Sequence, residues 1–321
     1  MTDAKHMLSR VVDSLYWMSR YLERAEHTSR LLDVYVNLML EKAPGTVEQQ
    51  RANRLLKSLN LKSTDAEGLD NLLHWLTFNP DNSHSILANI TAARENARQV
   101  REQTSSEMWM QINKLFLHVK EAGMNNTWMR SPHDFYVEVR EGAHLFQGIT
   151  DATMNHNQGW HFIQIGRYIE RTLGLLQLLK THFTDDSLTM PPELTTAMYF
   201  ELVAILKSVS AFEAYCKVFN PNVQTSRMIA FLLFDEQFPR SLRFCVDTTL
   251  HSMNALADAT MRSKNTRLYR VAGRLQSQLS FDEVSDITSL HEYLESVKQQ
   301  IYQIHDMLYD TYITYPIEMA L

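Results

Sequence analysis

The feature that most constrains the fold is a run of helical periodicity near the start of the chain. From Leu8 to Met39 the apolar positions recur in steps of three and four, or of their sum, for some ten turns. Residues three and four apart share one face of an α-helix, so this spacing predicts an amphipathic helix over about residues 7–42. Pro44-Gly45 is a strong signal for its end.

The rest of the chain has few residues that would interrupt helices. Only 9 glycines and 8 prolines occur in 321 residues, and we find no convincing alternation of period two. Few breaks in a long chain predict long elements, and these have helical periodicity. We expect helices over about 47–59, 66–78 (capped by Asp65) and 86–103 (capped by Ser83 or Ser85). A break and restart at 104–107 precedes a helix that ends at about 120. Further helices are expected over about 132–149, 159–182, 193–219, 223–234, 238–262, 266–279 and 289–313.

Composition and charge exclude several classes of protein. Apolar residues make up 45% and charged residues 21%, which is typical of a globular protein. The net charge of −6 argues against a general nucleic-acid binder. No apolar run approaches the ~18 residues of a membrane span, and no apolar segment of a signal peptide follows the N-terminus. Two cysteines cannot form a disulfide framework. We therefore expect a cytoplasmic protein that binds neither membranes nor nucleic acid.

A short charged motif lies in the middle of the first helix. Arg20, Glu23, Arg24 and His27 fall within about 100° of one another on the face opposite the apolar stripe. Tyr16 and Trp17 lie in nearly the same arc, and a merely solvated face rarely places such aromatic rings among its charges. A close copy, Arg167-Tyr168-Ile169-Glu170-Arg171, follows 147 positions later. We interpret the motif as a polar seam that contacts other parts of the protein.

A second pair of similar segments suggests a duplication. The stretch 78–86 resembles 234–242, at an offset of 156 residues. Two similarities at nearly one offset indicate a repeated unit of about 150 residues. We predict an all-α, single helical-bundle domain over residues 1–321, with long antiparallel helices. Its related halves, 7–150 and 151–315, would pack about a pseudo-two-fold axis and bring the two motif helices together in a central polar seam.

Several motifs, in order along almost the whole chain, resemble the bacterial Alpha-E family, an all-helical domain named for its Glu-Arg motif. The matching segments are 15–26, 93–98, 107–109, 166–171, 212–215 and 238–241. The motif's Glu and Arg correspond to Glu23, Arg24, Glu170 and Arg171. The resemblance implies an association with circularly permuted ATP-grasp proteins and transglutaminase-like proteins, and so a role in making or breaking amide or peptide bonds. It assigns no catalytic residues.

The charged seam has two interpretations. In the functional one it is a cleft that binds an anion, and Glu23 and Glu170 orient its arginines or act as acid or base. In the structural one, buried Glu–Arg pairs fix the register of the helices. The candidate ligand-binding residues of the motifs are Tyr16, Trp17, Arg20, Arg24, His27, Arg167 and Arg171.

Three further arginines, Arg94, Arg98 and Arg101, lie within about 60° on one face of a predicted helix. Aligned guanidiniums repel one another unless an anion lies nearby. If this helix packs against the seam, all these residues form one anion-binding cavity. Alternatively the three arginines form a solvated basic face.

No other pattern predicts a reactive centre. Glu141 and His144 have the Glu-x-x-His spacing of di-iron proteins, but such a centre needs two of these motifs and further glutamates. Cys216 and Cys245 lie among core-type residues. The chain has no glycine-rich phosphate loop. We therefore expect no bound metal and no cofactor.

Three functions remain open. The first is an accessory protein that binds an anionic or peptide-like small molecule, or docks an ATP-grasp or transglutaminase-like partner. The second is an enzyme of amide or acyl-transfer chemistry in which Glu23 or Glu170 is the acid or base. The third is a non-catalytic scaffold.

Overall fold

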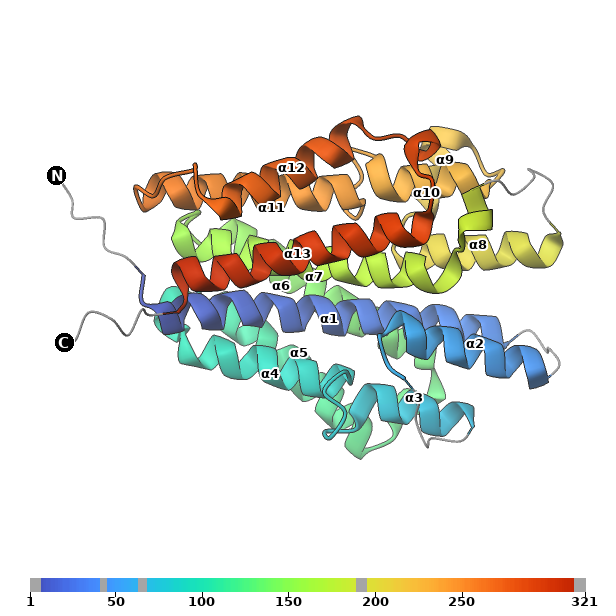
Figure 1. Cartoon of the computed structure of the whole chain (residues 1–321). Helices are drawn as coiled ribbons and strands as arrows, with labels where there is room; N and C mark the ends of the chain where they lie inside the picture. The colour runs from blue at the N-terminus through green and yellow to red at the C-terminus, as the bar shows by residue number, and fades with distance from the viewer. Residues whose placement is uncertain (1–6, 41–44, 63–67, 189–194, 315–321) are drawn as a thin grey trace.

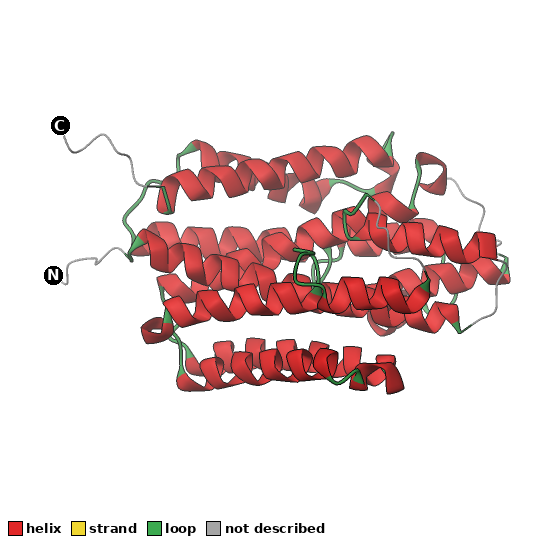
Figure 2. Ribbon diagram, turned by 90° about the horizontal axis from the view of Figure 1, so that it is seen from below, coloured by secondary structure: helices red, strands yellow, loops and turns green. Residues whose placement is uncertain are grey.

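The computed structural model describes residues 7–40, 45–62, 68–188 and 195–314, and every element among them is a helix (Figure 2). The prediction of an all-α protein is confirmed. The α-helices are α1 (Ser9–Met39), α2 (Gly45–Ser58), α3 (Leu69–Phe78), α4 (Ile86–Gln99), α5 (Ser106–Met124), α6 (Pro132–Thr153), α7 (Gln158–His182), α8 (Thr196–Ser208), α9 (Phe212–Phe219), α10 (Thr225–Phe234), α11 (Leu242–Ala259), α12 (Arg267–Phe281) and α13 (Leu290–Tyr312).

Helix α1 lies at the centre of the bundle and packs against α4, α6 and α7 (Figure 1). It runs antiparallel to α6, because Glu23 contacts Gln147 while Asp33 contacts Arg140. It also runs antiparallel to α4, since Ser14 near its start bonds to Gln99 at the end of α4. Helix α1 is thus antiparallel to α4 and α6, as predicted, but its direction relative to α7 is different.

The two motif helices, α1 and α7, run parallel to each other. Successive contacts move in the same direction along both helices, from Gly166 against Ser19 to Gly174 against His27. The first contact is very close: a Cβ on Gly166 would lie 2.4 Å from the carbonyl oxygen of Tyr16. Only glycine allows the two backbones to approach so closely here.

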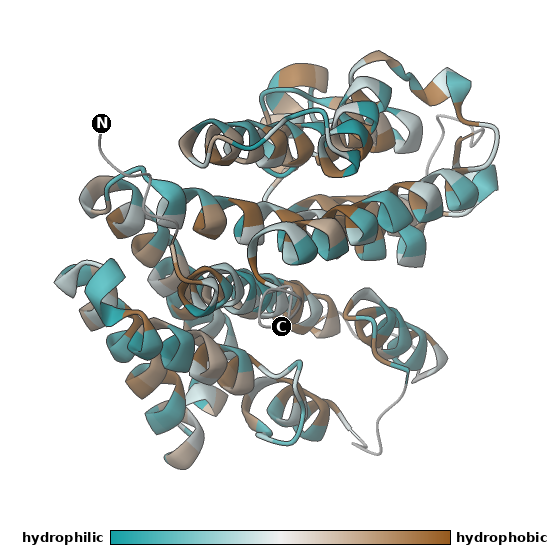
Figure 3. Ribbon diagram, turned by 60° about the vertical axis from the view of Figure 1, so that its left-hand side comes forward, coloured by the Kyte–Doolittle hydropathy of each residue, from teal (hydrophilic) through white to brown (hydrophobic). Residues whose placement is uncertain are grey.

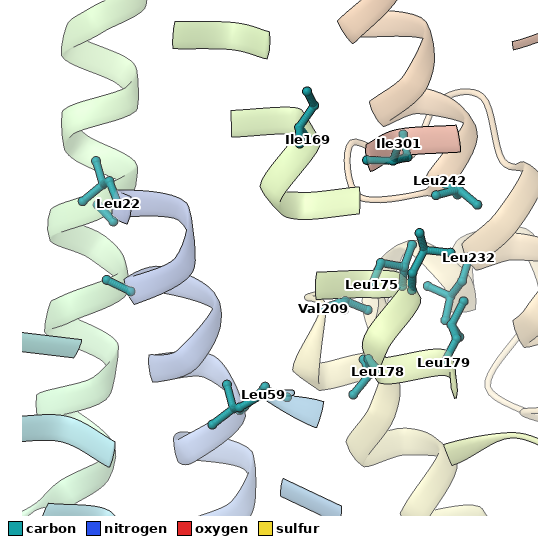
Figure 4. Packing of buried hydrophobic residues seen from close by; sticks show 14 of the residues in the cluster. Leu22, Leu59, Ile169, Leu175, Leu178, Leu179, Val209, Leu232, Leu242 and Ile301 are labelled. Atoms are coloured by element: carbon teal, nitrogen blue, oxygen red, sulfur yellow. The ribbon is translucent and has the colours of Figure 1, made fainter. Parts of the chain in front are cut away.

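Helix α7 continues the core into the second part of the chain, where it packs against α11 and α13. Figure 4 shows Leu175 and Leu179 of α7 beside Leu232 of α10, near Leu242 of α11. Helix α13 is antiparallel to α7 and returns to the start of α1, where Tyr309 bonds to Asp13. The long helices carry hydrophilic as well as hydrophobic residues (Figure 3), and no described helix is long and apolar enough to cross a bilayer.

Most predicted helix boundaries lie close to those of the structure, but one long helix is wrong. Residues 193–219 were expected as a single helix, whereas the described part of this stretch forms α8 and α9. The break is at Ser210, whose φ of 53° is left-handed. Of the two serines before α4, Ser83 and Ser85, it is Ser85 that caps the helix, because its side chain accepts a bond from the Ala88 amide. The predicted cap at Asp65 lies outside the described residues, and the division into halves stays a prediction.

Candidate functional site: a buried glutamate–arginine seam

The parallel packing of α1 and α7 brings the two motifs together, and they pair reciprocally. Glu170 of α7 accepts from Arg20 and Arg24 of α1, whose Nε atoms lie 2.7 and 2.6 Å from its two carboxylate oxygens. Glu23 of α1 accepts from Arg171 of α7, with Nε 2.7 Å from Oε1 and Nη2 3.0 Å from Oε2. Each motif therefore supplies the counter-charges for the other.

Both motif carboxylates are held in the ionised form. Burial by itself would raise the pKa of Glu23, whose side chain is 1% exposed, but Arg171 and Arg240 outweigh burial and hold this pKa well below its usual range. Arg20 and Arg24 likewise lower the pKa of Glu170 against the effect of burial. A carboxylate so stabilised has no proton to donate at neutral pH and is a weak base.

The aromatic residues of the first motif are held by α13. The Arg20 guanidinium lies 4.6 Å from the centre of the Trp17 ring, which is cation–π geometry. The Trp17 indole donates to the Tyr309 hydroxyl at 2.7 Å, and the Tyr16 hydroxyl lies 2.7 Å from Nδ1 of His305. Burial raises the pKa of Tyr16 to about 12. These side chains are therefore held by contacts within the protein.

The seam continues through residues that sequence reasoning did not select. Arg240, which lies just before α11, reaches Glu23 at 3.3 Å and Glu26 at 3.0 Å. Glu26, fully buried, is also paired with Arg30 one helical turn later and with Nε2 of His144 at 3.1 Å. Burial, and then the neighbouring Arg171, lower the pKa of Arg240 to about 10. The seam therefore joins α1, α6, α7 and the turn before α11.

Two sequence signals could have found this extension. Glu26 and Arg30 have the i,i+4 spacing of a helix ion pair. Arg240 belongs to the segment Phe238–Ser241, which carries part of the family resemblance. Neither signal tells which distant partners these residues meet, because that depends on the packing of the helices.

His27 lies beside the seam without contributing a charge. Its ring packs where α7 carries Gly174, 3.2 Å from a Cβ placed there, and its buried Nε2 has no hydrogen-bond partner among the described residues. Burial and the nearby Arg240 lower the pKa of His27 to about 4, so the ring is neutral at pH 7. Arg167 is buried as well, with Asp151 as its acidic partner at 3.9 Å.

Of the two interpretations of Arg94, Arg98 and Arg101, the shared anion-binding cavity is wrong, because none of the three lines the seam. Arg94 bonds to Asn113 and lies over the rings of Trp109 and Phe116, all on α5. Arg101 also lies over Trp109, and Arg98 is paired with Glu95, its side chain 62% exposed. The reason is the orientation of α4, whose buried face carries Ile86, Asn89, Ile90, Ala93 and Ala97 and leaves the arginines on its other side.

The remaining histidine and cysteine candidates do not form a reactive centre among the described residues. Within the described residues no three histidine, cysteine or acidic side chains lie close enough to hold a metal ion, and His144 is bonded to Glu26. Burial raises the pKa of Cys245 to about 12, which leaves it a neutral thiol. Cys216 is free and partly buried.

Fold and site together define an all-helical protein whose two Glu-Arg motifs meet in its interior. The model of the Alpha-E family, a predicted alpha-helical domain with a conserved ER motif, matches residues 7–313. The chain belongs to the Alpha-E family.

The chain is also similar to curated proteins, all uncharacterised. One from Mycobacterium bovis and two from strains of Mycobacterium tuberculosis are 25% identical to it over 96% of this chain. The match covers only 37% of the length of each relative. No solved structure matches the chain significantly.

Proposed function

We propose that this protein is an accessory subunit that binds an anionic, peptide-like molecule and works with an ATP-grasp or transglutaminase-like partner in amide or peptide bond metabolism. The partners follow from the family resemblance. The relatives support a role together with other protein segments, because the matched region makes up only 37% of their length.

The observation that carries the proposal is an excess of positive charge in the seam. Among the described residues, its ion pairs involve seven arginines and five acidic residues. The arginines are Arg20, Arg24, Arg30, Arg140, Arg167, Arg171 and Arg240, and the acids are Glu23, Glu26, Asp33, Asp151 and Glu170. Burying unbalanced charge is unfavourable. An anion bound at either end of the seam would compensate the excess positive charge and so be held there by the arginines.

The enzyme alternative receives no support from the motif glutamates. Glu23 and Glu170 are saturated by arginines, and their lowered pKa values suit neither general acid nor general base catalysis at neutral pH. The scaffold alternative has an observation in its favour, because the reciprocal pairs fix the register of α1 and α7. We assign this structural role to the paired motif residues. We assign ligand binding to the arginines that exceed the number of acidic residues.

The proposal is tested by measuring the thermal stability of the full chain with added glutamate or inorganic phosphate. A ligand that binds only the folded state raises the melting temperature in a saturable way. We expect this rise, its weakening at high salt, and no rise with glutamine amide, which has no carboxylate. If no anion stabilises the chain more than this amide does, the protein is not an anion-binding subunit.

A further inference from the structure

One end of the seam opens into a pocket. Its volume is about 620 Å³, and it is lined by residues of α1, α6, α8 and the start of α9. Arg30 lies at the boundary between the two: it pairs with Glu26 inside the seam and also lines the pocket, where it donates to Ser210. The pocket is therefore one of the places where the excess charge of the seam approaches solvent.

The pocket has two cationic groups without full compensation. Arg30 is 4% exposed, and its Nε has no acceptor among the described residues. Its carboxylate partner, Glu26, is shared with Arg240 and His144. Lys207 of α8 lies on the rim, exposed, with its ammonium 5.9 Å from the centre of the Phe212 ring.

The acidic residues of the pocket limit how much negative charge it can take. Asp33 is engaged by Arg140 at 2.7 Å, by His133 at 2.6 Å and by its neighbour Asn37. Glu213 is exposed on the rim. With these two carboxylates nearby, a ligand of several negative charges would be repelled. One singly charged carboxylate fits the pocket better than a phosphate ester.

Apolar side chains form the other wall. Phe200 and Val203 on α8 face the pocket together with Val34 and Leu38 on α1. Phe200 is 48% exposed, which leaves a large apolar surface in solvent beside the cationic groups. Cationic groups beside an apolar wall can bind an amphipathic carboxylate.

We propose that the pocket between α1, α6, α8 and α9 binds the carboxylate of a short peptide that ends in an apolar residue. The carboxylate lies between Arg30 and Lys207, and the terminal side chain packs on Phe200 and Val203. This inference rests on the proposed function, and it names the place of binding and the class of ligand.

The test uses isothermal titration calorimetry of the full chain with N-acetyl-glycyl-leucine and with its C-terminal amide. We expect the acid to bind and the amide to bind roughly tenfold more weakly or not at all, because a charge-assisted bond is lost. Lys207→Gln and Phe200→Ser should each weaken binding of the acid by about five- to tenfold. Lys217→Gln, which removes an exposed charge from α9 outside the pocket, is the matched control and should have no effect.

The outcomes separate this inference from the proposed function. Equal binding of acid and amide overturns the ligand class. If the acid binds and neither pocket variant weakens it, the anion lies elsewhere, for example beside Arg24 at the other end of the seam, and the pocket assignment is wrong. If neither the acid nor glutamate nor phosphate binds, the proposed function is wrong as well.

Discussion

At the scale of single residues, the seam is a chain of charges that depend on one another. Glu23 accepts from two arginines, Arg171 and Arg240, and also from Gln147. A buried ion pair adds little stability compared with well-packed apolar residues, but removing one partner leaves the other charge uncompensated. The protein should therefore be destabilised when any single partner is removed from the seam.

We expect Glu23→Gln to lower the free energy of unfolding by about 3–5 kcal/mol, because Arg171 and Arg240 would remain buried with less counter-charge. Urea denaturation measures this change. The matched control is Glu95→Gln, which breaks ion pairs with Arg94 and Arg98 near the surface and should cost less than about 1 kcal/mol. Similar losses in the two variants would contradict a central role for Glu23.

Sequence reasoning was most successful at this scale for residues on one helix. The face shared by Arg20, Glu23 and Arg24 follows directly from helical periodicity. The identity of their partners does not, because it depends on how α1 and α7 are aligned. Arg240 illustrates the limit: it lies 217 residues from Glu23 in the chain, and no local pattern connects the two.

At the scale of elements, the close approach of α1 and α7 determines which charges meet. Gly166 allows the approach, since its neighbour across the interface is the backbone of α1 at Tyr16. A flexible side chain could move aside, but a helix backbone cannot do so without shifting the whole helix.

Gly166→Ala should therefore destabilise the protein by at least about 1–3 kcal/mol, because the added methyl group separates the helices and lengthens the Glu–Arg pairs. The control is Gly148→Ala on α6, where an added Cβ meets nothing within 4 Å. That change replaces glycine in a helix and should stabilise by about 0.5–1 kcal/mol. In thermal denaturation we expect Gly166→Ala to lower the melting temperature and Gly148→Ala to raise it. If Gly166→Ala leaves the melting temperature unchanged, the interface between α1 and α7 is loosely packed.

The elements themselves were largely predictable, because scarce glycine and proline and a clear period of 3.6 leave few alternatives to long helices. The break between α8 and α9 was not, since Ser210 adopts a left-handed conformation in a stretch without glycine or proline. The position of Arg94, Arg98 and Arg101 also required the structure. Periodicity places them on one face but does not tell which neighbour that face meets.

At the scale of the whole molecule, we propose that the halves 7–150 and 151–315 arose by duplication. Two contacts across the interface support this, because Ser19 meets Gly166 and His27 meets Gly174, each pair separated by 147 residues. A third observation that supports duplication comes from the turns before α4 and α11. His84 lies near Arg24 and Glu170, while Arg240, 156 residues later, lies near Arg171 and Glu23. Such an arrangement makes the interior of the bundle depend on both parts of the chain.

This shared interior also predicts how the whole protein responds to acid. The rings of His27 beside the seam and His182 at the end of α7 are partly buried, and burial, with a nearby arginine in each case, lowers the pKa of both to about 4. In the unfolded chain they titrate near 6.5. Between these values the unfolded state binds more protons than the folded state, so the free energy of unfolding falls as the pH is lowered from about 6.5 towards 4.

His27→Gln should reduce that dependence, because glutamine does not titrate. One proton fewer taken up on unfolding lowers the slope by at most about 1.4 kcal/mol per pH unit between pH 6 and 4.5. Urea denaturation at several pH values in this interval measures the slope, and the exposed His156→Gln is a control that should leave it unchanged. If His27→Gln has the same slope as the unmodified protein, then His27 is protonated in the folded state and the seam tolerates one more positive charge beside it.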